Sequence, residues 1–217
     1  GWTKKDTSYY FSDYVKVIAK KLSDRVINWF PMNEIGVHSV GGYLERWHPP
    51  AKKGSMKTFY QVVHNMLLAH GLGVQSIRYC GIGKSVIGIA HAGTVMPQTN
   101  SKKDWEAAKR AMLTDTWFYF LYPIFKGKYH ELKIKEWGGD TPVYNDAEMD
   151  IISAPLDFLG LNIYFGHRYA YDSKRGFKEV EPPPGLRTSS GWEVNGDCLN
   201  YGVRVPYEVL NPKKIII

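Results

Sequence analysis

The sequence predicts an α/β fold in which a parallel sheet is joined by crossover helices, and two observations favour it. Short, nearly continuous apolar runs at 26–32, 85–90 and 156–165 are typical of strands buried on both faces. Segments in which apolar residues keep helical spacing separate these runs. Strands that alternate with helices in this way form a parallel sheet.

The individual elements follow from local signals. We expect a first helix from Tyr9 to Leu22, with Asp6 or Thr7 as its N-cap, because five apolar residues there share one helical face. The run 26–32 then forms a strand that Pro31 restricts near its end. Further helices are expected at 58–79, 102–121, 147–152 and 201–210, and "KKIII" at the end of the chain is expected to be a fourth strand cut short.

The segment 168–194 differs from the rest of the chain. Tyrosines, charges, "EPPPG" and "RTSSG" predict a long loop that includes a hairpin. Long loops in compact domains usually carry function or cover a site. We therefore expect one domain over 1–217, with this loop on the side of the active site.

Composition excludes several classes of protein. The chain has 217 residues, of which 44% are hydrophobic, so it can bury a sizeable core. The longest apolar run, 116–125, contains a proline and is about half the roughly 20 residues that a membrane span requires, so no membrane span is expected. Cys80 and Cys198 are far apart, as expected of buried thiols in a reducing compartment, which predicts a cytoplasmic protein.

The net charge of +7 does not predict a nucleic-acid partner, because the basic residues are dispersed. Their densest cluster, around "KIKEW", is interrupted by Glu131 and Glu136 and is interpreted as a solvated surface. The motifs also predict no metal and no cofactor. "CGIGKS" lacks the first glycine of a phosphate loop, and the histidines lack zinc spacing.

Polar residues follow two of the predicted strands where each one ends. Asn33 and Glu34 end the first strand, while Asn162 and Tyr164 end the third. In a parallel (β/α) barrel the active site is built at the carboxyl ends of the strands. Each pair alone is also compatible with an ordinary strand end in any α/β protein.

Several motifs taken together make the chain resemble glycoside hydrolase family 1, the β-glucosidase and β-galactosidase family. The resemblance runs over nearly the full length, through "FSDYV", "LSDRVINWFPMNEIG", "HNMLLAHG", "DFLGLNIY" and "GWEV". It implies a partial (β/α)8 TIM barrel that holds strands four to about seven with their helices. On this basis the chain is an internal fragment of a β-glycosidase.

The resemblance also implies roles for single residues. "PMNEI" matches the motif at the end of the fourth barrel strand, so Glu34 would be the general acid/base and Asn33 would bind the 2-hydroxyl of the sugar. "GLNIY" matches the end of the sixth strand, so Tyr164 would contact the nucleophile and Asn162 would belong to the sugar pocket. His48 and His91 are further substrate-binding candidates.

A retaining glycosidase needs two carboxyl groups about 5 to 5.5 Å apart, one as nucleophile and one as acid/base. In the family the nucleophilic glutamate ends the seventh strand, whereas this sequence stops at Ile217 just before it. We therefore expect complementary chain segments to supply the missing strands. The alternative is a noncatalytic half-barrel that binds a sugar or such a segment. The substrate implied is a β-linked glucoside or a related glycoside.

Overall fold

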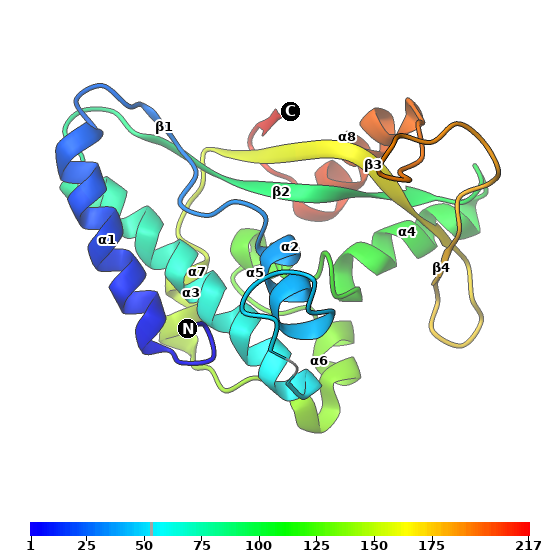
Figure 1. The fold of residues 1–217 in the computed structure, drawn as a ribbon, viewed down its shortest axis with the longest axis horizontal. Coiled ribbons are helices and arrows are strands. Elements are labelled where there is room, and N and C mark those ends of the chain that lie inside the picture. The colour runs from blue at the N-terminus through cyan, green and yellow to red at the C-terminus, as the bar shows by residue number, and fades with distance from the viewer. Residues whose placement is uncertain (53) are drawn as a thin grey trace.

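The computed structural model describes residues 1–52 and 54–217. Its centre is a five-stranded sheet in the order β1-β2-β3-β4, with β5 also beside β3 (Figure 1). The strands β1, β2, β3 and β5 pair in parallel, and β4 pairs antiparallel with β3. The predicted parallel sheet is therefore confirmed. The strands are β1 (Asn28–Trp29), β2 (Val86–Pro97), β3 (Phe158–Ala170), β4 (Lys178–Val180) and β5 (Ile215–Ile216).

Helices connect each parallel strand to the next. The long α3 packs along α1, and both lie below the strands in the view of Figure 1, while α4 and α8 contact β2 and β3. The helices are α1 (Asp6–Leu22), α2 (Ile35–Ser39), α3 (Met56–Cys80), α4 (Lys102–Thr114), α5 (Leu121–Lys126), α6 (Glu131–Trp137), α7 (Asp146–Ile152) and α8 (Asp197–Leu210), with a π-helical turn η1 (Val40–Leu44) and a 3₁₀ turn η2 (Gly138–Asp140).

Element boundaries differ from the expectations at several points. The first helix begins at Asp6, and Lys5 precedes it without a side-chain cap. The predicted single helix over 102–121 is wrong, because α4 ends at Thr114. Asp115 takes an extended conformation there, and its carboxylate accepts the Trp117 N–H at 3.0 Å. A side chain that hydrogen-bonds a nearby backbone N–H takes the place of a helical hydrogen bond, and this ends the helix.

Three strands also differ in length from the apolar runs that predict them, and one of these is β3, which runs on to Ala170, past the predicted end at residue 165. β1 is reduced to two residues, although an isolated parallel bridge between Asn33 and Ala90 continues its pairing. β2 extends to Pro97, well past the predicted end at residue 90. Its second half contains polar residues, so the apolar pattern does not predict that part of the strand. β2 nevertheless pairs with β3 as far as Tyr169.

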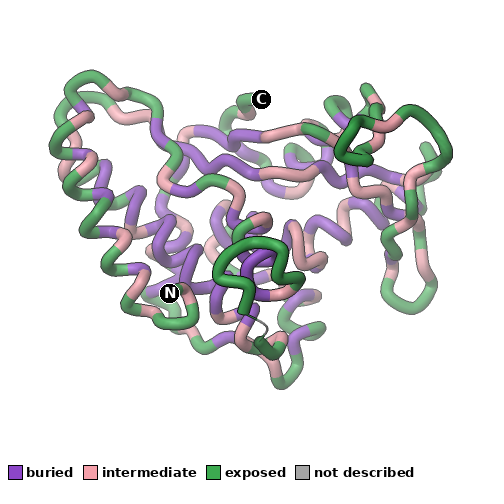
Figure 2. Tube along the Cα trace, in the orientation of Figure 1, coloured by how far each residue is buried: buried purple, intermediate pink, exposed green. Residues whose placement is uncertain are grey.

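The core lies between the sheet and the helices, where Figure 2 shows buried chain along α3 and the middle of β2. The close approach of α3 to α7 depends on Gly71. A Cβ at that position would lie 2.1 Å from the backbone oxygen of Ile151, so any larger residue would push the two helices apart. The opposite face of the sheet carries Phe30, which is 45% exposed.

The basic cluster around "KIKEW" is mostly the solvated surface that the sequence predicts, because Lys128, Lys135 and Glu136 are exposed, but one of its lysines is buried. It forms α6, and Lys133 on this helix is only 2% exposed. Its ammonium donates to the Thr114 backbone oxygen at 2.5 Å and lies 4.5 Å from the ring centre of Tyr119. Burial lowers the pKa of Lys133 to about 8, partly opposed by Glu136. The interpretation is wrong for Lys133 alone, because charge counts do not show which lysine caps the end of a neighbouring helix.

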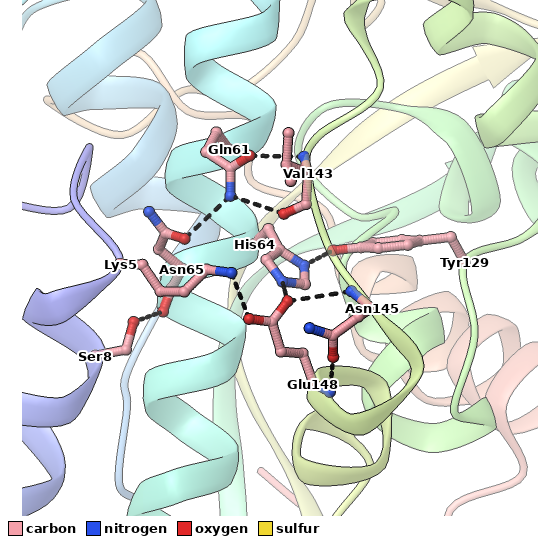
Figure 3. A network of polar contacts seen from close by, with 9 residues as sticks. All are labelled: Lys5, Ser8, Gln61, His64, Asn65, Tyr129, Val143, Asn145 and Glu148. Atoms are coloured by element: carbon pink, nitrogen blue, oxygen red, sulfur yellow. Dashed lines mark hydrogen bonds and ion pairs between the residues drawn. The ribbon is translucent and has the colours of Figure 1, made fainter.

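A buried polar network joins the start of the chain to the helix layer (Figure 3). Glu148 on α7 accepts from the ammonium of Lys5 at 2.5 Å and lies 3.4 Å from Nε2 of His64 on α3. The other ring nitrogen of His64 is 2.8 Å from the hydroxyl of Tyr129. Asn145 caps α7 and exchanges hydrogen bonds with Glu148 in a capping box. The network therefore fixes α1, α3 and α7 against one another.

Candidate functional site

Glu34 lies where β1 gives way to α2. Its N–H donates to the Ala90 backbone oxygen of β2 at 2.8 Å, and its own backbone oxygen accepts from His38 at 3.1 Å as the helix begins. Between these bonds the backbone of Glu34 takes φ 54° and ψ 54°, in the left-handed region. For a residue other than glycine this conformation costs about 1–2 kcal/mol. Strain of this kind is often found at functional sites.

Side chains at the end of β1 meet the middle of β3, which runs on to Ala170 and does not end at Asn162 and Tyr164 as the sequence predicts. The Asn162 amide donates to Oε1 of Glu34 at 2.6 Å and to the side-chain oxygen of Asn33 at 3.1 Å. The pairing of the strands explains why Asn162 can reach both residues. Ala90 of β2 bridges to Asn33 on one side, and Ala92, two residues further along β2, pairs with Asn162 of β3 on the other. The structure thus brings together three of the six candidate residues.

An irregularity in the sheet directs the next residues of β3. Ala92 pairs with Asn162, but Thr94 already pairs with Gly166, so three residues of β3 face the single residue Gly93 of β2. Bulges of this kind bend the strand, and they are common next to active sites. Tyr164 lies in the bulge and is 58% exposed.

A cavity of about 330 Å³ opens beside Glu34. Most of its wall is aromatic, and Glu34 is the single carboxylate among the described residues that line it. Such walls suit a flat apolar ring or the face of a sugar. The lining consists of Glu34, Val37, Trp47, Ala92, Gly93, Trp117, Tyr164, Phe165, His167 and Trp192.

The loop after β3 supplies one wall of this cavity. The indole of Trp192 stacks on Tyr164 at 5.7 Å and on Phe165 at 5.1 Å between ring centres. Next to it, Glu193 accepts two hydrogen bonds from the guanidinium of Arg168, at 2.7 and 3.0 Å. These bonds hold the pKa of Glu193 below its usual value, against the effect of burial. The ion pair therefore anchors the loop to β3, and Glu193 is engaged in structure.

The two histidine candidates lie apart from this group. His48 is exposed in the segment after η1, where its ring contacts Trp47 at 5.0 Å between centres. His91 is 2% exposed and packs edge-on against Phe118 and Phe120. It does not line the cavity, although its neighbour Ala92 does, because successive side chains of a strand point to opposite faces.

Burial also determines the charge of His91. Neither ring nitrogen has a hydrogen-bond partner among the described residues. Burial, with a smaller effect of nearby His167, lowers the pKa of His91 to about 3. The residue is therefore neutral at physiological pH and belongs to the core behind the sheet.

Sequence reasoning named Glu34 and Tyr164 among the ten residues of the cavity and missed the others, including Trp47, Trp117, His167 and Trp192. A signal was present for two of these, because Trp192 lies in the quoted motif "GWEV" and Trp47 directly precedes the candidate His48. Trp117 and His167 have no such signal. They reach the cavity because α4 ends early and because the β3 bulge shifts the alternation of side chains.

Asp157 lies at the amino end of β3, where its carboxylate accepts from the Ile87 N–H at 2.8 Å and from Arg78 at 3.2 Å. Burial favours a higher pKa for Asp157, but these bonds outweigh it and lower the pKa.

Within residues 1–52 and 54–217, no helix is long and apolar enough to cross a membrane, and no three side chains form a metal-binding group.

Comparison with protein families gives one match over most of the chain. Residues 1–196 match the model of glycosyl hydrolase family 1. A 1,4-beta-D-glucan glucohydrolase of Thermotoga neapolitana is 30% identical over 222 residues, which covers 100% of this chain and 51% of the relative. Beta-glucosidase A of Acetivibrio thermocellus is 37% identical over 202 residues, covering 89% of this chain and 44% of the relative.

Solved structures agree with these relatives. A family 1 glycoside hydrolase of Thermotoga maritima, in complex with a cyclophellitol analogue, superposes with a TM-score of 0.84 at 29% identity and covers 99% of this chain. The virulence factor SghA, in complex with the substrate analogue salicin, gives a TM-score of 0.85 at 29% identity. The chain spans 48% of each of these structures, so it is about half the length of the proteins that it matches.

Proposed function

Because the chain belongs to glycosyl hydrolase family 1, we propose that it forms part of a retaining β-glycosidase with Glu34 as the general acid/base. One observation carries the proposal. Glu34 lies at the carboxyl end of a parallel strand, accepts from Asn162 and opens onto a cavity with aromatic walls. The substrate class would be β-linked glucosides or related glycosides, as the names of the relatives indicate.

The geometry around Glu34 suits proton transfer. The amide nitrogen of Asn162 can only donate, so Oε1 of Glu34 acts as an acceptor whether the carboxyl group is ionised or protonated. Oε2 makes no hydrogen bond within the described chain and can carry the proton. It would donate that proton to the leaving oxygen and later take one from water. In that assignment Asn33 would bind the 2-hydroxyl, and Asn162 would complete the sugar pocket.

The nucleophile must come from outside these 217 residues. Glu34 is the single carboxylate of the described cavity, whereas the retaining mechanism needs a second one about 5 to 5.5 Å away. The coverage of the relatives leaves about half of their length for it. We propose that β1, β2, β3 and β5 correspond to barrel strands four to seven. Complementary chain segments would then pair with the edges at β1 and β5, and Tyr164 would contact the nucleophile that they carry.

A noncatalytic role is the second candidate. The cavity is formed by this chain alone, so a half-barrel could bind a sugar or an aryl ring without turnover. Hydrolysis assays separate the two functions, and they must be run on the 217-residue chain and on a longer chain that includes the complementary segment.

The test compares leaving groups in the longer protein. Glu34→Gln is expected to lower kcat/KM about 10²- to 10⁴-fold for a methyl or methoxyphenyl β-glucoside, whose leaving oxygen needs a proton. The loss should be much smaller for a 2,4-dinitrophenyl glucoside, whose oxygen leaves without one. Glu106→Gln, at an exposed glutamate on α4, is the matched control and should change neither rate. Equal losses for both leaving groups would contradict the acid/base role of Glu34.

A further inference from the structure

One imidazole in the cavity has two nitrogens in different surroundings. His167 on β3 lines the cavity together with Glu34. Its Nδ1 lies 2.7 Å from Oε1 of Glu179 on β4. An ionised carboxylate can only accept, so Nδ1 carries a hydrogen and donates it. In the neutral ring, Nε2 is then left with an exposed lone pair.

The side of the His167 ring that carries Cδ2, the carbon bonded to Nε2, lies next to the cavity. The Nδ1 edge faces Glu179, and both residues also line a second hollow of about 380 Å³. On the opposite edge, Cδ2 is 3.8 Å from the position that a Cβ on Gly93 would take, and Gly93 lines the cavity. Nε2 is bonded to Cδ2 and makes no hydrogen bond within the described chain. The lone pair of His167 is therefore available to a ligand.

The imidazole is held in this orientation from several sides. Trp117 packs against it at 5.6 Å between ring centres with planes 34° apart, and Phe165 packs at 5.3 Å. Phe118 meets it edge-on at 5.5 Å. The β3–β4 pairing places Glu179 opposite Tyr169, two residues along β3 from His167. A ring fixed in this way loses little entropy when it accepts a hydrogen bond.

We propose that His167, oriented by Glu179, accepts a hydrogen bond from a hydroxyl of the leaving group and so selects aryl aglycones that carry one. This inference rests on the proposed function, in which the cavity beside Glu34 receives the leaving group. The walls formed by Trp117, Phe165 and Trp192 suit a flat aromatic ring. An aglycone without the hydroxyl would cover Nε2 and leave it unpaired, which is the basis of selection.

Binding to the 217-residue chain tests this without any need for turnover. The probes are 4-methoxyphenol and 1,4-dimethoxybenzene, in which a methyl group replaces the hydroxyl hydrogen of the phenol. The tryptophans of the cavity report binding by fluorescence. The parent chain should bind the phenol about three- to tenfold more tightly, the value of one hydrogen bond. In His167→Phe, which keeps an aromatic ring, the ratio should fall to about one. His167→Gln retains an acceptor and should recover part of the preference.

Several results would overturn the inference. These are an unchanged preference in His167→Phe, no saturable binding of the phenol to the folded parent, or tighter binding of 4-methoxybenzoate than of the phenol. The last would show a donating imidazolium in place of the lone pair. Glu34→Gln separates the two proposals, because it should abolish acid/base catalysis in the longer protein and leave the phenol preference intact. Circular dichroism confirms that each variant is folded.

Discussion

Two glutamates in different regions of the molecule have opposite surroundings. Glu148, in the helix layer, accepts from Lys5, lies against His64 and exchanges hydrogen bonds with Asn145 (Figure 3). Glu34, at the strand ends, accepts from one neutral amide and opens onto a cavity. A cation fixes the charge of a carboxylate, whereas an amide tolerates both protonation states. The partners therefore distinguish a carboxylate that holds the fold together from one that can exchange protons.

The pKa values of the helix layer follow the same rule. Burial favours a higher pKa for Glu148, but the hydrogen bond and the charge of Lys5, with smaller effects of neighbouring groups, together outweigh it and lower the pKa. Burial lowers the pKa of His64 despite the nearby carboxylate. A neutral His64 donates from Nε2 to Glu148 and accepts from the Tyr129 hydroxyl at Nδ1, so every group in the contact is satisfied. This region is built to keep each charge state constant.

The largest effect on stability should appear in acid, and it should come from the buried His91 of β2. The pKa of His91 is lowered to about 3 by burial, whereas an unfolded histidine titrates near about 6.5. The unfolded chain therefore binds the extra proton first. Stability is full above about 6.5 and falls as pH drops from there toward the folded value, by about 1.4 kcal/mol per pH unit for this residue.

Urea unfolding at pH 7, 6, 5 and 4 measures that slope. His91→Phe places a neutral ring between Phe118 and Phe120, and it should reduce the pH dependence by about one proton. The exposed His48 supplies the matched control, because His48→Phe should leave the slope as it is. A parent slope that His91→Phe does not change would show that His91 accepts its proton in the folded chain.

An intermediate effect is expected from the two glutamates themselves. Glu148→Gln removes the negative charge that Lys5 contacts and places an NH2 donor against the N–H groups of Asn145 and His64, so it should lower the free energy of unfolding by about 1–3 kcal/mol. Glu34→Gln keeps an acceptor for Asn162 and should change it by less than about 0.5 kcal/mol. Urea unfolding at pH 7 gives both values. If Glu34→Gln were the more destabilising change, the distinction between the two regions would fail.

The sequence predicted much of this arrangement, for physical reasons that can be identified. Buried strands and long helices have strong apolar patterns, so the parallel sheet and the helices around α3 could be predicted. The strand-end rule predicted that Asn33, Glu34 and Asn162 lie together, and their side chains do meet, although Asn162 lies within β3 and not at its end. The same rule could not place His91, because the sequence in the middle of β2 does not show which face a side chain takes.

The remaining features depend on contacts between distant segments. The left-handed turn at Glu34 is held by Ala90 of the next strand and opposes the local preference of a glutamate. The bulge that shifts Tyr164 and His167 exists in the register between β2 and β3 and has no local signal. Lys133 is buried because its ammonium caps the carboxyl end of α4 at Thr114, which lies nineteen residues away.

The smallest effect should come from the cation of the helix-layer network. The side chain of Lys5 is 37% exposed. In Lys5→Met, water can therefore replace part of the hydrogen bonding that Glu148 loses. We expect a loss of about 0.5–1 kcal/mol at pH 7 that shrinks as salt is added. The depressed pKa of Glu148 contributes stability above the unfolded value near about 4.3, and this contribution is lost as pH falls through the folded value.

Lys5→Met should therefore differ from the parent at pH 7 and approach it in acid, as measured by urea unfolding at both pH values. Lys16→Met, at an exposed ion pair with Asp13, is the matched control. A difference between Lys5→Met and the parent that persisted undiminished in acid would mean that Lys5 stabilises the chain by packing against α7. The charge of Glu148 would then be maintained by His64 and Asn145, and the contrast with Glu34 would depend on hydrogen bonds alone.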